Sequence, residues 1–125
     1  TAIFCDAPSL SLGEDNLVQK ATRKLEEHVG RSLPFSLHLE KKIPIAAGLA
    51  GGSTDAAATL SALNELYELG LSTVELQSVG RTVGADVPFC LSEEPCSFAT
   101  GIGEVLEPIR HALRPEVLIV NPRIE

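Results

Sequence analysis

A glycine-rich segment with two hydroxyl side chains is the part of the sequence best suited to chemistry. It runs from Pro44 to Ala58, after a predicted strand and into a predicted helix. Glycine lets backbone N–H groups approach a ligand because no Cβ atom intervenes, and the first turn of a helix offers N–H groups that lack intrahelical acceptors. Ser53 and Thr54 add hydroxyl donors at the same place. Together these groups predict a cradle for an anion such as a nucleotide phosphate.

Two common phosphate loops do not fit this segment. A Walker A loop requires a Gly five residues and a Lys six residues after its first Gly, and here Ser53 and Thr54 stand at those positions after Gly48. A Rossmann loop requires a Gly two residues after the first, where this chain has Ala50. The segment is therefore either a phosphate loop of another kind or a tight strand–helix turn closed by a Ser, Thr or Asp cap.

Two lysines and one aspartate are the charged groups that could assist such a cradle. Lys41 and Lys42 lie just upstream and could make the local potential positive, although a solvated strand end is the simpler interpretation. Asp86 lies within the stiff segment Gly84–Phe89. Phosphoryl transfer to an alcohol needs a carboxylate that orients the hydroxyl and accepts its proton. Judged alone, Asp86 is better explained as a turn residue, and it becomes a candidate base only if the fold brings it to the glycine loop.

Charge and cysteine content exclude several classes of protein. Ten Lys and Arg residues against 17 Asp and Glu residues give a net charge of −7 at pH 7. This balance argues against a general nucleic-acid binder and against docking on anionic membranes. The three cysteines form no C-x-x-C pair, so no disulfide framework and no metal site on the protein is predicted, and a reducing compartment fits best.

Helices and short strands must position these groups. Apolar patterning predicts strands over residues 1–6 and 35–40 and strand segments near 89–91, 97–99 and 105–106. Helical periodicity predicts helices over residues 17–29, 53–69 and 73–84. The first helix is expected to be capped within residues 14–16, and the third by a capping box formed by Ser72 and Glu75. The pattern predicts an α+β fold with helices packed on one face of a sheet.

The Pro44–Ala58 segment resembles the second motif of the GHMP kinases, the superfamily of galactokinase, homoserine kinase and mevalonate kinase. More narrowly, the chain resembles one family of this superfamily, whose members phosphorylate a cytidine-diphosphate-linked methylerythritol. The stretches that carry this narrower resemblance, in order and spacing, are Glu14–Val18, Ile43–Asn64, Gly84–Phe89 and Gly101–Glu104.

The resemblance implies an ATP-dependent kinase of non-mevalonate isoprenoid biosynthesis, which phosphorylates the 2-hydroxyl of the methylerythritol unit. It implies Asp86 as the catalytic base and a magnesium ion that accompanies ATP, with Ser53 or Thr54 near the ion. The partners would be ATP and this small-molecule substrate, without nucleic acid or membrane. The residues implied to hold the ATP phosphates are Pro44, Ala47, Gly48, Leu49, Ala50, Gly51, Gly52, Ser53 and Thr54.

The fold implied by the resemblance is the ribosomal-protein-like α+β fold of the GHMP-kinase N-terminal domain, with a mixed sheet, present here incompletely. Residues 1–116 are expected to belong to this ATP-binding domain, and residues 117–125 to begin a C-terminal domain whose first strand is Val117–Pro122. Such a segment is expected to be inactive alone. The implied compartment is the bacterial cytoplasm, or the plastid stroma of a plant or alga.

Two alternatives and one departure accompany the resemblance. The chain could belong to another GHMP kinase, acting on mevalonate, homoserine or a sugar, or it could be a nucleotide-binding module without turnover. Ala50 stands where the family usually has a Gly. An alanine is expected to be acceptable there only if its φ is negative.

Overall fold

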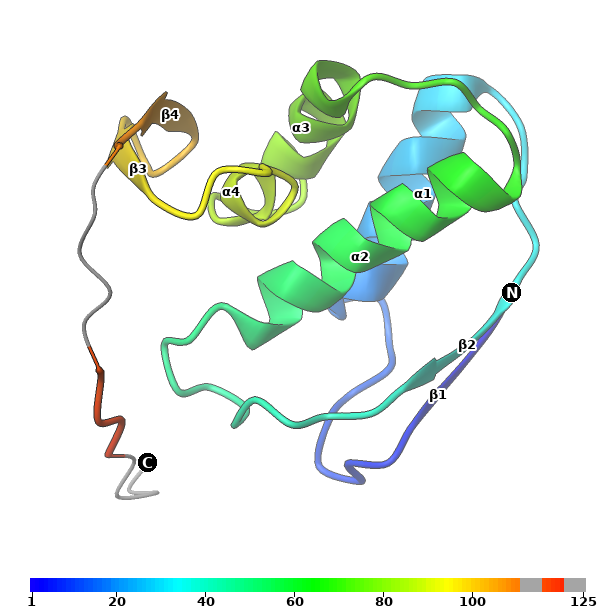
Figure 1. Cartoon of the computed structure of the whole chain (residues 1–125). Coiled ribbons are helices and arrows are strands. Elements are labelled where there is room, and N and C mark those ends of the chain that lie inside the picture. Colours follow the sequence, from blue (N-terminus) through cyan, green and yellow to red (C-terminus); the bar gives the residue numbers. More distant parts are fainter. Residues whose placement is uncertain (111–115, 121–125) are drawn as a thin grey trace.

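The chain forms a β–α–β unit, then three helices, then a β-hairpin (Figure 1). The structure, a computed structural model, describes residues 1–110 and 116–120. The strands within these ranges are β1 (Ala2–Cys5), β2 (Ser36–Leu39), β3 (Ser97–Thr100) and β4 (Val105–Pro108). The helices are α1 (Leu17–Val29), α2 (Gly51–Leu66), α3 (Thr73–Arg81) and α4 (Val87–Cys90). None of the described helices is long and apolar enough to cross a bilayer.

The strands pair in two places. Strand β1 runs parallel to β2, with Ile3 beside Leu37, while β3 runs antiparallel to β4, with Thr100 opposite Val105. The α+β class is confirmed, but the described strands form two separate two-stranded sheets and not one continuous mixed sheet. Each strand has only four residues, so neither pair offers a face wide enough to cover the helices. The helices bury one another instead.

The helix boundaries follow the predicted capping signals. The Asn16 side chain accepts a hydrogen bond from the N–H of Val18 at the start of α1, and Gly30 ends that helix with a left-handed φ of 69°. At the start of α3, the Ser72 hydroxyl accepts from the Glu75 N–H. In return, the hydroxyl and the N–H of Ser72 donate to the Glu75 carboxylate and hold its pKa below the usual range.

One local prediction is wrong. Residues 89–91 do not form a strand, because most of this segment lies in helix α4. Pro88 occupies the first turn of α4, where its missing N–H costs nothing, and a short apolar run cannot distinguish helix from strand. Residues 117–120 form no strand with the described residues and are 60% to 88% exposed. That they begin the first strand of a second domain stays a prediction. The rest of the predicted strand and second domain, residues 121–125, lies outside the described residues.

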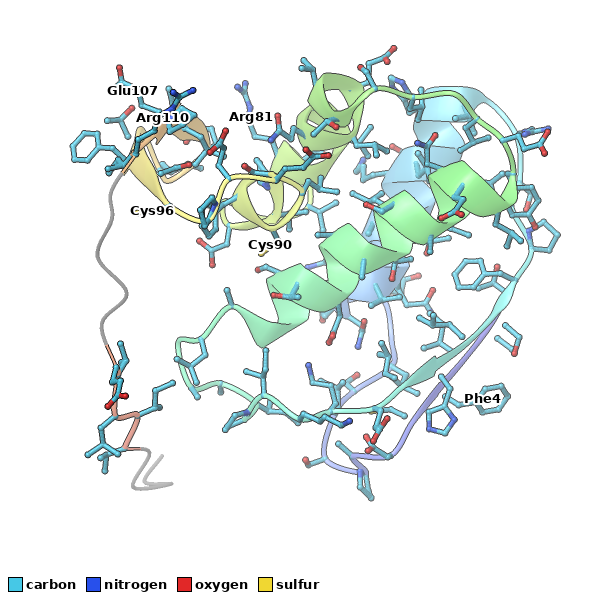
Figure 2. All side chains as sticks on the ribbon, viewed as in Figure 1. Phe4, Arg81, Cys90, Cys96, Glu107 and Arg110 are labelled. Carbon is cyan, nitrogen blue, oxygen red and sulfur yellow. The ribbon has the colours of Figure 1, made fainter. Side chains whose placement is uncertain are left out.

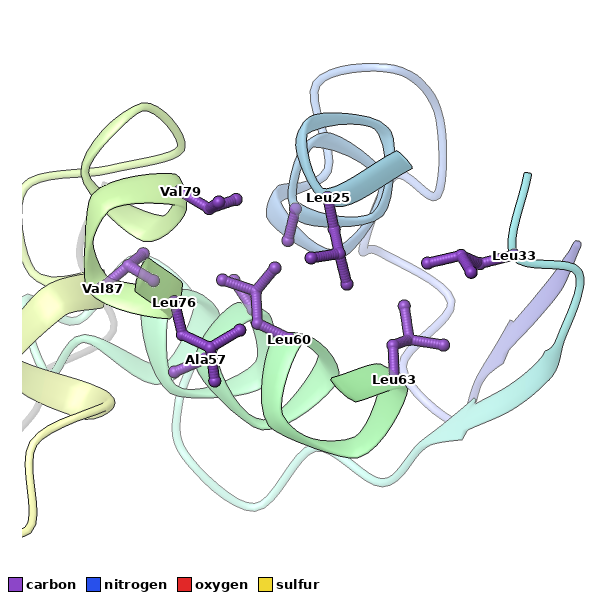
Figure 3. Packing of buried hydrophobic residues seen from close by; sticks show 10 residues of the cluster. Leu25, Leu33, Ala57, Leu60, Leu63, Leu76, Val79 and Val87 are labelled. Atoms are coloured by element: carbon purple, nitrogen blue, oxygen red, sulfur yellow. The ribbon is translucent and has the colours of Figure 1, made fainter. Parts of the chain in front are cut away.

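The core lies where the four helices meet (Figure 3). Leu60 of α2 is fully buried between Leu25 of α1 and Leu76 of α3. The buried cluster consists of Ala21, Leu25, Leu33, Ala56, Ala57, Leu60, Leu63, Leu76, Val79 and Val87. This packing fixes α2, and therefore the loop that leads into it.

Replacing Leu60 by Ala should lower the free energy of unfolding by about 2–5 kcal/mol, because it removes buried apolar surface and leaves a cavity. Leu66→Ala in the same helix is the matched control. Its side chain is 66% exposed, so the expected change stays within about 0.5 kcal/mol. Chemical denaturation of both variants measures the difference. Equal effects of the two substitutions would contradict this assignment of the core.

Candidate functional site

The glycine-rich segment forms a loop that leaves β2 and enters α2 (Figure 1). Three of its residues have left-handed backbone conformations: Ala46 (φ 57°), Gly48 (φ 69°) and Ala50 (φ 52°). The negative φ that was set as the condition for an alanine at position 50 is therefore not met. An L-residue pays about 1–2 kcal/mol for this conformation because its Cβ crowds a carbonyl oxygen. The entry into α2 thus imposes a left-handed turn even where the residue is not glycine.

The first turn of α2 presents open backbone donors. The N-cap residue is Ala50, and no side-chain hydrogen bond from the described residues caps the first N–H groups of the helix. The Thr54 hydroxyl instead donates to the Ala50 carbonyl at 3.0 Å. The alternative of a turn closed by a Ser, Thr or Asp cap is therefore excluded. The N–H groups of residues 51–53 have no intrahelical acceptors and lie at the positive end of the helix dipole. Such a helix start favours an anion.

A cavity of about 380 Å³ lies beside this loop, within the roughly 300–1,000 Å³ typical of small-molecule sites. Thr54 does not line it, although it was predicted to hold phosphate. The other residues predicted for that role do line it: Pro44, Ala47, Gly48, Leu49, Ala50, Gly51, Gly52 and Ser53. The structure therefore gathers the predicted loop residues around one cavity, with Thr54 as the exception.

Two glycines of the helix start lie in close packing. A Cβ atom at Gly51 would lie 2.9 Å from Cγ2 of Ile43, and one at Gly52 would lie 3.3 Å from Cδ1 of Leu17. Neither glycine has a positive φ, so the limit here is space and not backbone conformation. Gly51 therefore lets α2 begin close to Ile43, and Gly52 lets it pack closely against Leu17 at the start of α1.

The two lysines upstream of the loop have different environments. Lys41 is not part of a solvated strand end, because its side chain is only 8% exposed. It lines the cavity, and its Nζ lies 2.5 Å from Oδ2 of Asp55. Lys42 is solvent-exposed and lies 3.3 Å from a carboxylate oxygen of Glu40. Because each ammonium has a carboxylate partner, the lysines add less positive potential than the sequence suggested. The backbone N–H groups are thus the main attraction for an anion.

Asp86 lies immediately before α4 and is exposed. It does not line the cavity, but its segment is held against the start of α2. Cys90 points from α4 towards α2 (Figure 2), and its Sγ lies 3.6 Å from Oγ1 of Thr54. The N–H of Cys90 bonds to the carbonyl of Asp86, so Asp86 is one helical turn from this contact. The fold therefore brings the Asp86 segment to the edge of the glycine-loop region.

Helix α3 fixes the position of the Asp86 segment. A Cβ atom at Gly80 would lie 2.8 Å from Cγ1 of Val87, so only glycine allows α3 and α4 to approach this closely. The side-chain amide of Gln77 also donates to the carbonyl of Pro88 at 3.1 Å. These contacts explain why the short segment around Asp86 has a defined place although α4 is only one turn long.

Sequence reasoning did not predict several residues of the cavity wall, of which Asn16 and Asp55 make side-chain hydrogen bonds there. Asn16 was named among the capping residues 14–16 and within a stretch that resembles the family, but not as a site residue, yet it lines the cavity while its Nδ2 donates to the carbonyl of Ser11 at 2.8 Å. Asp55 was not singled out, although it lines the cavity and holds Lys41. The sequence did contain a signal for this ion pair: a lysine lies near the end of a predicted strand, and a carboxylate lies in the first turn of the helix that follows.

A cavity lined by a glycine loop and an uncapped helix start, on an α+β framework, is a candidate site for a phosphate-bearing ligand. Residues 16–94 match the family model described as the GHMP kinases N terminal domain. This match covers more than half of the chain, and the chain therefore belongs to the GHMP kinase family. The predicted superfamily is confirmed.

Several relatives of the chain share the same protein name. The chain is 44% identical over 121 residues to a 4-diphosphocytidyl-2-C-methyl-D-erythritol kinase from Synechococcus sp. (strain JA-2-3B'a(2-13)). It is 45% identical over 123 residues to the kinase of the same name from Thermoanaerobacter pseudethanolicus. These alignments cover 97% and 98% of this chain but 39% and 42% of the relatives. The chain thus spans about two fifths of their length.

A solved structure shares the fold. The crystal structure of 4-(cytidine 5'-diphospho)-2C-methyl-D-erythritol kinase matches with a TM-score of 0.66 and 39% sequence identity. The match covers 87% of this chain and 38% of that one. The narrower resemblance predicted from the sequence is therefore confirmed as a similarity to this kinase family.

Proposed function

We propose that the protein carrying this chain is an ATP-dependent kinase that phosphorylates the 2-hydroxyl of 4-diphosphocytidyl-2-C-methyl-D-erythritol in non-mevalonate isoprenoid biosynthesis. The observation that carries the proposal is the cavity bounded by the glycine loop and by the uncapped start of α2. The names of the relatives supply the substrate.

ATP would bind with its phosphates against the loop. The N–H groups of Gly51, Gly52 and Ser53 point from the first turn of α2, where they would donate to phosphate oxygens without competition from a side-chain cap. Such fixed donors stabilise the charge of the transferring phosphoryl group because they need no reorganisation during the reaction. The loop residues from Pro44 to Ser53 would shape the rest of this wall.

A magnesium ion would enter with the nucleotide. Mg²⁺ is commonly held by one or two protein oxygens together with substrate phosphates, and when bound it neutralises phosphate charge. The Ser53 hydroxyl fits this role because it lies in the cavity wall at the helix start. The Thr54 hydroxyl fits less well because it is bonded to the Ala50 carbonyl. Within the described residues no cluster of three His, Cys, Asp or Glu side chains could hold a metal by itself.

Asp86 would act as the general base. Its carboxylate would accept the proton of the 2-hydroxyl while that oxygen forms a bond to the γ-phosphorus of ATP, and the bond from phosphorus to the ADP oxygen breaks. The exposure of Asp86 suits a group that meets a separately bound substrate, and the contact between Cys90 and Thr54 keeps it near the phosphate loop.

The domain assignment and compartment belong to the same proposal. Residues 1–116 would form part of the ATP-binding domain, and residues 117–125 would begin the next domain. We propose the bacterial cytoplasm as the compartment, or the plastid stroma if the source is a plant or alga. Three free cysteines and the bacterial relatives support a reducing compartment.

A panel of acceptors tests the substrate. The full-length protein should transfer phosphate from ATP to the cytidyl-linked methylerythritol, and not to mevalonate, homoserine or galactose. Coupled detection of ADP with each acceptor measures this preference. Phosphorylation of mevalonate, homoserine or galactose, but not of the cytidyl substrate, would favour another GHMP kinase. ATP binding without transfer to any acceptor would favour a nucleotide-binding module.

A further inference from the structure

One ion pair at the cavity is withdrawn from water. The Lys41 side chain is 8% exposed and its Asp55 partner 25% exposed, whereas every side chain in the other described ion pairs is at least 40% exposed. Exposed pairs contribute little to stability, but removing one partner of a buried pair leaves an uncompensated charge. The Lys41–Asp55 pair is therefore the one whose loss should change the local structure.

Lys41 is anchored at its backbone as well as at its ammonium. Its N–H donates to Oδ1 of Asp6 at 2.9 Å, and the N–H of Asp6 donates to the carbonyl of Leu39 at 3.2 Å. These bonds fix Lys41 where strands β1 and β2 both end. Its Nζ then reaches Asp55 in α2, fourteen positions further along the chain. The pair thus joins the end of the parallel sheet to the helix.

The chain between the two partners is the glycine loop itself. Its left-handed residues other than glycine, Ala46 and Ala50, hold conformations that persist only when the surrounding structure imposes them. The Lys41 Nζ would also lie only 3.6 Å from a Cβ atom at Gly51, so the ammonium packs against the helix start. The ion pair therefore connects the two ends of the loop, next to the open N–H groups of the first turn of α2.

We propose that the Lys41–Asp55 pair is a staple that fixes the glycine loop in its ligand-binding shape before a nucleotide arrives, and that Asp55 is a positioning residue. Preorganising a loop removes an ordering cost that the ligand would otherwise bear. The staple is inferred from the geometry of the nucleotide-free protein alone. Its expected effect on the KM for ATP rests on the proposed function.

Hydrogen exchange on the full-length, nucleotide-free protein tests the staple directly. In Asp55→Asn, the hydrogen-bonded amides where the loop joins α2, residues 54–57, should exchange about tenfold faster or more because the loop opens more often, while α1 keeps its rate. Glu27→Gln is the matched control, since it breaks the exposed Lys24–Glu27 pair and should leave the loop unchanged. Unchanged exchange of these amides in Asp55→Asn would overturn the proposal.

Kinetics separate positioning from a merely structural role. We expect the KM for ATP to rise about tenfold in Asp55→Asn while kcat at saturating ATP changes by less than about threefold, because bound ATP reorders the loop. Asp55→Glu keeps the charge and should recover most of the loss. A fall in kcat at unchanged KM would overturn the positioning role. Faster exchange of the same amides in a protein without kinase activity would sustain the staple and refute only the proposed function.

A double variant covers the case in which Asp55→Asn does not fold. Lys41→Met combined with Asp55→Leu removes both charges, so no unpaired charge remains buried, and such replacements are commonly neutral for stability. The amides of residues 54–57 in this variant should still exchange about tenfold faster than in the parent protein, because the staple is absent. Parent-like exchange in the double variant would contradict the proposal.

Discussion

Asp86→Asn in the full-length protein should lower kcat by about 10²–10⁴-fold and leave ATP binding largely intact. General-base catalysis contributes factors of this size, and an amide cannot accept the proton of the acceptor hydroxyl. Asp86 lies outside the cavity wall, so its replacement should not disturb the site proposed for the phosphates. Steady-state turnover and calorimetric titration of ATP measure the two effects separately.

Glu93→Gln is the control for charge. Glu93 is an exposed carboxylate in the segment after α4, so the control removes one negative charge nearby without touching the proposed base. Its kcat should remain within about twofold of the parent value. Normal turnover of Asp86→Asn would identify Asp86 as a turn residue and refute its proposed catalytic role.

Gly48→Val should raise the KM for ATP by about tenfold to a hundredfold, because small misplacements of a positioning element have effects of this size. Gly48 has a φ of 69°, and a Cβ atom placed there would meet nothing within 4 Å. Steric overlap is therefore not the cause of the expected loss. A β-branched residue disfavours the left-handed conformation by about 1–2 kcal/mol or more, so the loop should change its path.

Two other glycines provide unusually close controls for Gly48. Gly30, after α1, and Gly70, before α3, have the same φ of 69° and equally open surroundings. Neither lines the cavity. Gly30→Val and Gly70→Val should therefore reduce the unfolding free energy by a similar amount but leave the KM for ATP unchanged. If all three variants raised KM alike, the effect would reflect general destabilisation and not the loop.

The features predicted well from sequence are those set by neighbours in the chain. The Asn16 cap, the Gly30 terminus and the Ser72–Glu75 capping box each depend on residues within one turn, and the structure confirms all three. The glycine loop was predicted as a cradle because its glycines and its position before a helix are visible in the sequence. Most of its residues do line the cavity.

The features that sequence reasoning missed depend on distant parts of the chain. The Lys41 side chain is buried, its ammonium is paired with Asp55 fourteen positions away, and its backbone N–H is bonded to Asp6, 35 positions away. Ala50 adopts a left-handed φ because the loop must turn into α2, which local preference opposes. Tertiary contacts of this kind override local propensity and cannot be derived from residue spacing alone.

The most direct test of the central claim follows the loop amides during a titration with ATP. In the isotope-labelled full-length protein, addition of Mg·ATP should shift the amide resonances of Gly51, Gly52 and Ser53 more than those of α1 or of the β3–β4 hairpin. The account predicts this because those N–H groups would become donors to phosphate oxygens. Saturating ATP binding that leaves these three resonances unmoved would contradict the assignment of the glycine loop as the phosphate site.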